Sequence, residues 1–582
     1  MDINDYDIVI LGSGLAGMRA ALEATLVSKG KLSIAIVTKL HAMRSHSVSA
    51  EGGISGVLYG KENNDSKSLH AYDTIKGSDY LADQDAVELL VENAPKEITL
   101  FDHLGVPWNK DASGRIKSRA FGGMSIPRTV FAEDKTGFFM LSALYDNLME
   151  FGNVTIFHEH FTTRIIMDGD SFAGLSAIDL STGEHKLFTG SCCIVATGGH
   201  SRIHGFTTTA HSCTGDGTAL LYGGGATLKD MEFVQFHPTA LVPNGILISE
   251  ACRGEGAYLI NSKGERFMKY YASAKMELAP RDIVSRAIIT EIKKGNGFTE
   301  ETSGLKYVGL DLRHLGRSVI DEKLPMVGEI TGSTLGLDPA EDVIPVRPAA
   351  HFTMGGTNTD IDGKVIMWHG RPSPNLWAAG ECGCVSIHGA NRLGSNSLSQ
   401  CLTWGRITGD GAARLTLSGK ARQSDNGYLA KAEQEEEKRI ESLMMKKGKY
   451  NPYDIKKGMH DTMDSLAYVY KNTKDMQLAV RRIGALRKRF NDIRVDDSSK
   501  VYNTNLRDVL EIANLVELAY VVVCCAANRK ESRGAHAVLE YPKRDDKSWL
   551  KHTIAHKDSS GNPAISYSPV KITKWQPEER KY

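Results

Sequence analysis

The chain has 582 residues, more than one hydrophobic core usually holds, so we expect two to four domains. Lys plus Arg and Asp plus Glu both number 70, and this zero net charge argues against a nucleic-acid partner. The nine cysteines are scattered without a CxxC pair, which is typical of reduced cytosolic thiols and predicts no iron–sulfur cluster and no metal site in this chain.

The N-terminus predicts the start of a nucleotide-binding fold. Residues 6–11, YDIVIL, form an apolar strand, and we expect no targeting segment before it. The glycine-rich GSGLAG follows, then a helix that ends at Gly30 and a second strand within residues 31–39. This order is that of a dinucleotide-binding βαβ unit.

Gly12, Gly14 and Gly17 have the spacing that permits a tight turn, close approach of a pyrophosphate and close helix packing. NAD-binding folds usually add an acidic residue about 20 positions later, where it holds a ribose. No Asp or Glu occurs from Ala24 to Ala50, so FAD is the better candidate and an NAD-dependent dehydrogenase the weaker one.

Two later segments, residues 192–199 and 375–381, again place glycine directly after an apolar strand. We therefore expect one sheet that is interrupted by insertions. Residues 423–530 are strongly helical and charged, and the polar, turn-rich end of the chain predicts strands and loops. The apolar run at residues 515–527 contains Glu517 and is too short to span a bilayer, so it predicts a buried helix.

His46 lies in the stretch MRSHSVSAEGG at residues 43–53. A single histidine is most often an ordinary turn residue. Here small residues and glycines surround it, so the backbone can approach a flat ring system and no bulky neighbour shields the imidazole.

Polar residues beside glycine or proline recur in the later segments. Any one of them is more often structural, but several together indicate convergence on a small anion. Two histidines and two arginines suit a dicarboxylate, because guanidinium groups bind carboxylates in a bidentate manner. The candidates are His237, Ser249, Glu250, Arg253, Arg281, His351 and Arg392.

These motifs, together with FGGMSIPRTVFAEDKTG, DLRHLG and RKESRGAH, occur in the order of a known family. The chain resembles the flavoprotein subunits of succinate dehydrogenase and fumarate reductase over nearly its whole length, and is closest to the quinol:fumarate reductase branch. The resemblance implies an α/β fold: a Rossmann-like FAD-binding domain with an inserted α+β capping domain, then a helical domain and a small C-terminal segment. The expected bounds are 1–227 and 348–420 for the FAD-binding domain, 228–347 for the capping domain, 421–541 for the helical domain and 542–582 for the C-terminal segment.

The family's RSH histidine is bonded to the 8α position of FAD, and His46 matches it. The resemblance therefore implies FAD as a covalent cofactor. The other residues that it places at the FAD site are Gly12, Gly14, Gly17, Ser45, Gly52, Gly53, Asp216, Glu381 and Ser397.

For the substrate, fumarate or succinate, the resemblance implies that His237, His351 and Arg392 hold the carboxylates. Ser249 stands where the family usually has threonine, a change that keeps the hydroxyl donor. Phe121 is expected to pack beside the substrate.

Arg281 is the implied proton donor or acceptor for hydride transfer between flavin and substrate. An arginine of ordinary pKa is a poor acid, so this role needs a relay. Glu250 and Arg253 match the residues that form this relay in the family.

The resemblance also implies an iron–sulfur subunit and membrane anchor subunits with quinone, which would hold the chain peripherally on the cytoplasmic face of the cell membrane. Fumarate-reducing members tend to have Glu at the position of Glu51, and succinate oxidisers Gln. We therefore expect fumarate reduction, with succinate oxidation as the alternative. The argument assumes that a negative charge on Glu51 disfavours further charge on the flavin.

Two rival functions remain. An L-aspartate oxidase shares the fold but lacks the RSH histidine, so His46 discriminates against it. A flavin-binding or assembly protein without catalysis is disfavoured by the intact set of histidines and arginines.

Overall fold

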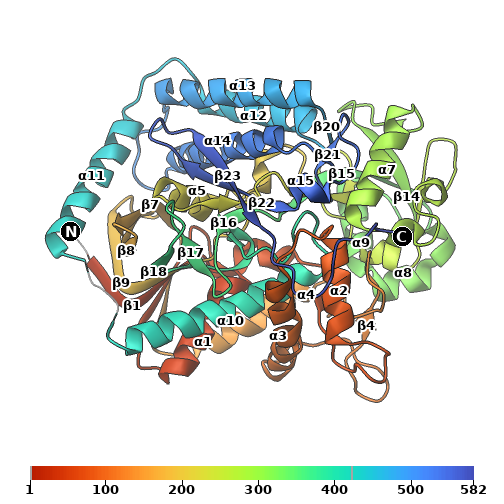
Figure 1. Cartoon of the computed structure of the whole chain (residues 1–582), viewed down its shortest axis with the longest axis horizontal. Coiled ribbons are helices and arrows are strands. Elements are labelled where there is room, and N and C mark those ends of the chain that lie inside the picture. Colours follow the sequence, from red (N-terminus) through yellow and green to blue (C-terminus); the bar gives the residue numbers. More distant parts are fainter. Residues whose placement is uncertain (1–2, 421–423, 582) are drawn as a thin grey trace.

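Residues 3–420 and 424–581 are described by the structure, a computed structural model of the chain (Figure 1). Parallel strands form the centre of its largest sheet, in the order β18, β9, β1, β2, β6. Their bounds are β1 (Ile3–Leu11), β2 (Ile34–Val37), β6 (Val154–Phe157), β9 (His185–Val195) and β18 (Pro372–Ala378). The paired ends of β1, β2 and β9 are apolar and buried, as in parallel sheets covered on both faces.

The order of these strands confirms the expectation of one interrupted sheet, because β9 lies between β1 and β18 although long insertions separate the three in sequence. Ile10 pairs with Ile36 on one side and with Ile194 on the other. Antiparallel strands extend this sheet: β7 (His160–Asp168), β8 (Ser171–Asp179) and β17 (Lys364–Ile366).

Helices cover both faces of the sheet. On one face they share a core with Ile8 and Ile10 of β1, whereas Val9 points to the opposite face and packs with Leu221. The helices of the first face are α1 (Leu15–Ser28), α3 (Gln84–His103), α4 (Thr136–Met149) and α10 (Asn396–Leu417), with α2 (Lys67–Gly77) against α3 and α5 (Asp216–Gly223) on the other side. A small sheet joins β3 (Ile54–Ser55), β4 (Ser118–Arg119) and β5 (Thr129–Val130).

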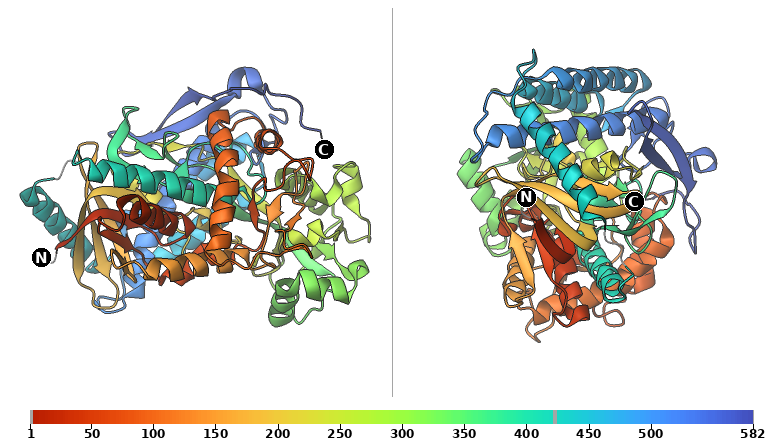
Figure 2. Two further views of the ribbon diagram at one scale, coloured as in Figure 1. Left: turned by 90° about the horizontal axis from the view of Figure 1, so that it is seen from below. Right: turned by 90° about the vertical axis from the view of Figure 1, so that its left-hand side faces the viewer.

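The inserted region lies at the end of the molecule opposite the N-terminus (Figures 1 and 2). It has its own core and is called the capping region below. Its strands are β11 (Val234–Leu241), β12 (Tyr258–Ile260), β13 (Phe298–Thr299), β14 (Lys306–Asp311) and β15 (Ile344–Thr353), and its helices α6 (Ala251–Gly254), α7 (Arg281–Lys293), α8 (Arg317–Lys323) and α9 (Pro325–Leu335). The strand β15 runs through the boundary predicted between residues 347 and 348, so the two regions share a continuous strand there.

Four helices follow along the chain: α11 (Asn426–Met444), α12 (Pro452–Leu466), α13 (Thr473–Arg489) and α14 (Thr504–Asn528). Helices α12, α13 and α14 form the layer at the top of Figure 1, whereas α11 lies at the left side and contacts β7 and β8. The predicted start of this part at residue 421 lies outside the described residues. Helix α14 packs against α12, α13 and α5 and thereby joins the layer to the sheet.

Helix α14 corrects one expectation. It is 25 residues long, and by length and composition alone it is long enough to cross a membrane. The helix is therefore longer than the apolar run at residues 515–527 indicated. However, 67% of its most apolar window is buried inside the protein, as is typical of a core helix. The expectation of a buried helix therefore agrees with its packing.

The C-terminal residues return to the middle of the molecule. They form α15 (Asp546–Trp549), β22 (Lys551–Lys557) and β23 (Pro563–Pro569), and β22 pairs with β10 (Leu228–Lys229). The same sheet includes β16 (Gly356–Asn358) and β19 (Gly383–Cys384), while β20 (Tyr470–Lys471) pairs with β21 (Ala537–Val538). The five-stranded sheet that contains β22 and β23 connects the end of the chain to β10 and β16, the strands that flank the capping region.

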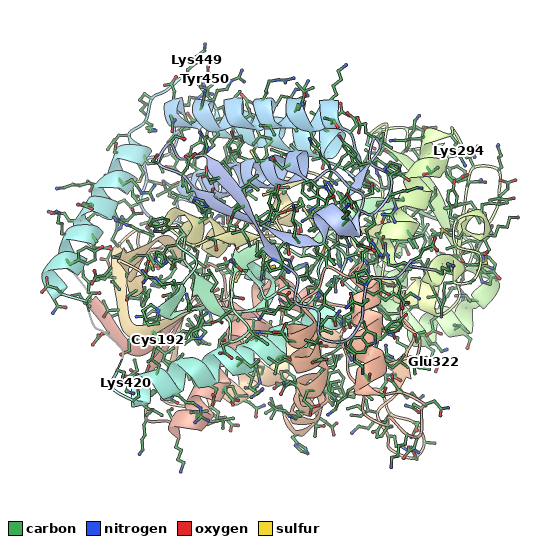
Figure 3. The ribbon with its side chains drawn as sticks, in the orientation of Figure 1. Cys192, Lys294, Glu322, Lys420, Lys449 and Tyr450 are labelled. Atoms are coloured by element: carbon green, nitrogen blue, oxygen red, sulfur yellow. The ribbon has the colours of Figure 1, made fainter. Side chains whose placement is uncertain are left out.

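Figure 3 labels side chains from the interior and from the surface of the protein. Cys192 is fully buried in β9, whereas Lys294, Glu322, Lys420 and Lys449 are exposed. Every cysteine is a free thiol, and most are buried, as expected for small apolar side chains.

Candidate active site

A cavity of about 870 Å³ runs between the glycine turn after β1 and the capping region. All of the predicted site residues line it except Gly17 and Arg253. Residues from the sheet, from η2 (His46–Ser49), from α7 and from β11 and β15 contribute to the same wall. The fold therefore brings together side chains that are up to several hundred positions apart in sequence.

The glycine turn has the geometry that its spacing predicts. Gly12 adopts a φ of 109°, and a Cβ there would lie 2.4 Å from the carbonyl oxygen of Ala196. Gly17 does not line the cavity but packs against the turn, because a Cβ placed there would lie 2.0 Å from the carbonyl oxygen of Gly12. Gly14 is the N-cap of α1 and offers no capping side chain, and the first turn has no acidic residue. This helix N-terminus is suited to an anion such as a pyrophosphate.

Lys39 lies where the missing ribose acid was sought, just after β2, and the sequence-based reasoning overlooked it. Its Nζ lies 2.6 Å from Asp216 Oδ2, 2.6 Å from Glu511 Oε1 and 2.7 Å from Thr214 Oγ1. Asn514 also donates to Asp216, at 2.9 Å. The position of Lys39 just after the second strand was the sequence feature that could have indicated it. Through these contacts Asp216 is fixed between the sheet and α14.

His46 is held by one hydrogen bond from the backbone. The N–H of Ala210 donates to its Nδ1 at 3.3 Å, which assigns the ring hydrogen to Nε2. Burial, and secondarily Arg202, lower the pKa of His46 to about 4. The imidazole is therefore neutral at pH 7, the state that a nucleophilic or covalently bonded ring nitrogen requires.

Glu51 lies on the same wall, and its Oε2 is buried without a hydrogen-bond partner in the described structure. Burial and the neighbouring Asp134 raise the pKa of Glu51 to about 8. The carboxyl is therefore mostly protonated at pH 7. This corrects the charge argument made from the sequence, in which Glu51 was treated as an ionised group.

His237 and His351 face each other across adjacent strands, with ring centroids 4.9 Å apart. The backbone N–H of Thr239 donates to His237 Nδ1 at 3.3 Å, and the Thr208 hydroxyl lies 2.6 Å from His351 Nδ1. Burial and the charge of Arg281 hold both pKa values well below the usual range. Both rings are neutral, and His237 has its Nε2–H left to donate to a substrate carboxylate.

Arg392 adds a fixed positive charge to this end of the cavity. Its Nη1 donates to Ser397 Oγ at 2.8 Å, its guanidinium lies 4.5 Å from the centroid of the Phe352 ring, and its Nε is buried without a partner. Burial and Arg281 lower the pKa of Arg392 to about 9, so it stays protonated at pH 7. Two guanidinium groups in one buried cavity favour a dianionic ligand.

Arg281 is the first residue of α7, and its side chain meets Glu250. Its Nε donates to Glu250 Oε2 at 2.7 Å, and Nη2 lies 2.6 Å from the same oxygen. Arg253 lies behind Glu250, with Nη2 3.6 Å from Oε1, and does not line the cavity. Burial would raise the pKa of Glu250, but Arg281 and Arg253 outweigh it and lower the pKa. The three groups form a connected chain of charges that leads away from the cavity.

Gln235 is a second residue that the sequence-based reasoning missed. It accepts a hydrogen bond from Arg281 Nη1 at 3.1 Å and donates to the backbone oxygen of Arg392 at 2.8 Å. It therefore fixes the two arginines relative to each other. The available signal was the two-residue spacing from His237, which places both side chains on the same face of β11.

The remaining predicted residues complete the wall. Ser249 and Phe121 are buried, and Phe121 would contact a Cβ placed at Gly52 at 2.9 Å. Glu381 accepts from the backbone N–H of Thr353 at 2.9 Å, and burial raises its pKa to about 7.

The cavity fits FAD and a small ligand together. Buried polar atoms without a partner are rare in proteins, yet several line this cavity among the described residues. Glycines at both ends give the backbone close access to a ligand, and the N-terminus of α1 offers a phosphate site. The orphaned atoms are Ser45 Oγ, Glu51 Oε2, Ser395 Oγ and Arg392 Nε.

Comparison with known proteins agrees with this geometry. Residues 7–398 match the family model of an FAD binding domain, and residues 456–582 match that of the fumarate reductase flavoprotein C-terminus. The fumarate reductase flavoprotein subunit of Mycobacterium tuberculosis is 42% identical over 591 residues, covering 99% of each chain. The succinate dehydrogenase flavoprotein subunit of Rickettsia bellii is 39% identical over 580 residues, covering 98% of this chain and 96% of the relative. A structure of quinol fumarate reductase from E. coli superposes with a TM-score of 0.95 at 37% identity, covering 100% of this chain and 99% of that one.

Fold and site together define a flavoprotein oxidoreductase with an FAD-binding domain. Both family models and relatives that span the whole chain then identify the family. The chain belongs to the succinate dehydrogenase and fumarate reductase flavoprotein family, and the predicted α/β fold class is confirmed.

Proposed function

We propose that this chain is a catalytic subunit that reduces fumarate to succinate at FAD held covalently by His46, with succinate oxidation as the reverse reaction. The observation that carries the proposal is the buried contact between Arg281 and Glu250, 2.6 Å long, beside two neutral histidines and a second arginine. This arrangement combines a dicarboxylate-sized set of donors with a group that can deliver a proton.

The dicarboxylate is bound and oriented by His237, His351 and Arg392. Their hydrogen bonds and fixed charge favour the negative charge that develops on the carboxylates as the alkene is reduced. The Ser249 hydroxyl adds a donor, and Phe121 limits access of water to the reacting carbons. When bound, FAD supplies the hydride that adds to one alkene carbon.

Arg281 delivers the proton to the other alkene carbon. Because a neutral arginine side chain is costly, the proton must be replaced at once. Glu250 lies within hydrogen-bond distance and passes on a proton that its carboxylate first receives from Arg253, which is in turn reprotonated from solvent. Arg253 lies on the far side of Glu250, where it is the next group of the relay and orients the carboxylate between proton transfers.

His46 is proposed as the tether of the flavin. Its Nδ1 accepts the Ala210 N–H, which leaves Nε2 as the nitrogen for the bond to the cofactor. The ring is neutral at pH 7 because burial lowers its pKa. An L-aspartate oxidase has no histidine tether, so this residue also separates the two functions.

Electrons are proposed to reach this chain from an iron–sulfur subunit and a membrane anchor with quinone, which hold it peripherally on the cytoplasmic face of the membrane. One similar solved structure is a quinol–fumarate reductase with menaquinol molecules, with a TM-score of 0.94 at 37% identity. Another is a Mycobacterium smegmatis Sdh1 complex with UQ1, with a TM-score of 0.84 at 30% identity. Both support a quinone-linked complex.

The direction is proposed from the relatives rather than from charge. Those named fumarate reductase flavoprotein subunits reach 42% identity, and succinate dehydrogenase subunits reach 39%, so the preference for fumarate reduction is small. The test uses the purified complex with a reduced viologen dye and fumarate, succinate with an oxidised dye, and L-aspartate with oxygen. Fumarate reduction faster than succinate oxidation at matched driving force supports the proposal. Aspartate oxidation without fumarate reduction would replace it.

A further inference from the structure

Asp282, the residue next to Arg281 on α7, is completely buried and paired with two arginines. Arg286 Nη2 lies 2.9 Å from its carboxylate, and Arg580 Nη2 lies 2.6 Å away. Arg286 is on the same helix, whereas Arg580 comes from the end of the chain. Burial would raise the pKa of Asp282, but Arg580 and Arg286 outweigh it and lower the pKa to about 2. The carboxylate is therefore charged at pH 7.

Arg580 belongs to an irregular segment, residues 571–580, that we name the C-terminal strap. Several contacts fasten it to the start of α3. Among them, Gln84 Oε1 accepts from the backbone N–H groups of Thr573, Lys574 and Trp575 at 3.1, 2.8 and 3.0 Å. Gln84 Nε2 also donates to the oxygen of Trp575 at 2.6 Å. Figure 1 shows the C-terminal segment reaching the capping region.

The guanidinium of Arg580 bridges two parts of the molecule. On one side its Nε lies 3.2 Å from Asp79 Oδ1 and its Nη1 donates to the oxygen of Gly77 at 3.4 Å, just after α2. On the other side it binds Asp282 of the capping region. Asp79 is fixed in turn by Arg544 at 2.8 Å. Removing one partner of such a buried bridge is destabilising, because it leaves an uncompensated buried charge.

The bridge acts on the helix turn that carries Arg281. Successive residues of an α-helix point about 100° apart, so Arg281 can face the cavity while Asp282 faces the strap. An anchor on Asp282 fixes both the rotation of α7 and its distance from the rest of the protein. The reach of Arg281 into the cavity depends on both.

We propose that Arg580 is a positioning residue for proton transfer: through Asp282 the C-terminal strap holds the first turn of α7 so that Arg281 reaches the substrate. This inference rests on the proposed function, in which Arg281 delivers the proton. It assigns a role in the reaction to a side chain that does not line the cavity.

The test compares Arg580→Gln with Lys581→Gln in the full-length holoenzyme. Lys581 is the residue that follows the strap, its side chain is 82% exposed, and its variant removes the same charge. For Arg580→Gln we expect kcat for fumarate reduction to fall about 10-fold to 100-fold, as for a small misplacement of a catalytic group. The FAD content stays normal, and the solvent deuterium isotope effect on kcat becomes larger, because proton transfer limits the rate. Lys581→Gln behaves as wild type.

Arg580→Lys is a second variant that keeps the charge but loses the bidentate bridge, and it serves if Arg580→Gln does not fold. For Arg580→Lys we expect a smaller fall in kcat than for Arg580→Gln, again with a larger solvent deuterium isotope effect than in wild type. Unchanged kcat and isotope effect in either folded variant would overturn the role of Arg580. If Arg281→Ala is inactive in the same assay, that result leaves the proposed function standing. Turnover in Arg281→Ala would instead remove Arg281 from the proton-transfer role on which this inference rests, and only a wild-type protein without fumarate reduction would remove the proposed function itself.

Discussion

The guanidinium of Arg281 lies 2.6 Å from the carboxylate of Glu250, and the side chains are only 7% and 1% exposed. A buried ion pair of this kind positions both groups and leaves each strongly dependent on the other. Gly122 fixes the second oxygen of Glu250 through its backbone N–H at 2.8 Å. The carboxylate is therefore oriented before any ligand binds.

The first prediction concerns Glu250→Gln. The amide cannot return a proton to Arg281, so we expect fumarate reduction to fall about 100-fold or more, with FAD still bound. Steady-state assays with reduced dye measure this. Glu255→Gln, in the same region but paired with Lys323 outside the cavity, is the control and stays active. Near-normal turnover of Glu250→Gln would exclude it from the relay.

The second prediction concerns the tether. In His46→Ser the protein binds FAD without a covalent bond, because the glycine turn and the α1 N-terminus remain. After acid precipitation the yellow colour stays in the pellet for wild type and moves to the supernatant for the variant. His211→Ser, which also removes an imidazole from the cavity wall, retains the colour. Flavin retained by His46→Ser would show that another residue forms the bond.

The third prediction concerns Glu51→Gln. Glutamine resembles the protonated carboxyl, and the pKa of Glu51 is about 8, so the variant and wild type behave alike at pH 7. Above pH 8 only wild type gains a negative charge at this position. We expect the ratio of fumarate reduction to succinate oxidation to depend on pH around 8 in wild type and to lose this dependence in Glu51→Gln. A large difference at pH 6.5 would mean that Glu51 is already ionised.

The fourth prediction concerns stability. His552 lies between Asp230 and Asp83, at 2.7 and 3.2 Å, and although burial opposes it these carboxylates raise the pKa from 6.5 to about 9. A raised histidine pKa stabilises the folded state fully below the unfolded pKa, and this contribution is lost as pH rises through the folded pKa. The contribution to the free energy of unfolding is about 3 kcal/mol at pH 6.5, and most of it is lost by pH 9.

Denaturant unfolding of wild type across this pH range measures the loss. His552→Gln is less stable than wild type at pH 6.5 and approaches it at pH 9. Parallel pH profiles of the two proteins would contradict the raised pKa of His552.

Local patterns predicted much of the fold and of the site. The apolar strands followed by glycine predicted that β1, β9 and β18 lie in one sheet, because burial on both faces leaves a continuous apolar run. Most of the residues chosen by motif line one cavity. The length of α14 was underestimated because Arg507, Asp508 and Glu511 interrupt the apolar pattern before residue 515, although they belong to the same helix.

Contacts between distant segments could not be predicted in this way. Lys39 fixes Asp216 only because the fold brings Thr214, Asp216 and Glu511 into contact with its ammonium group. The protonation of Glu51 follows from burial, which no local pattern reveals. The pairing of Arg580 with Asp282 joins residues that are hundreds of positions apart.

The most direct test of the central claim is the rate of fumarate reduction by Arg281→Ala in the FAD-containing protein. The account predicts a loss of about 1,000-fold or more, because the relay through Glu250 then ends without the side chain that passes the proton to the substrate. It also predicts that flavin stays in the acid-precipitated pellet and that fumarate still binds through His237, His351 and Arg392. Turnover close to that of wild type, with the flavin in place, would contradict the account.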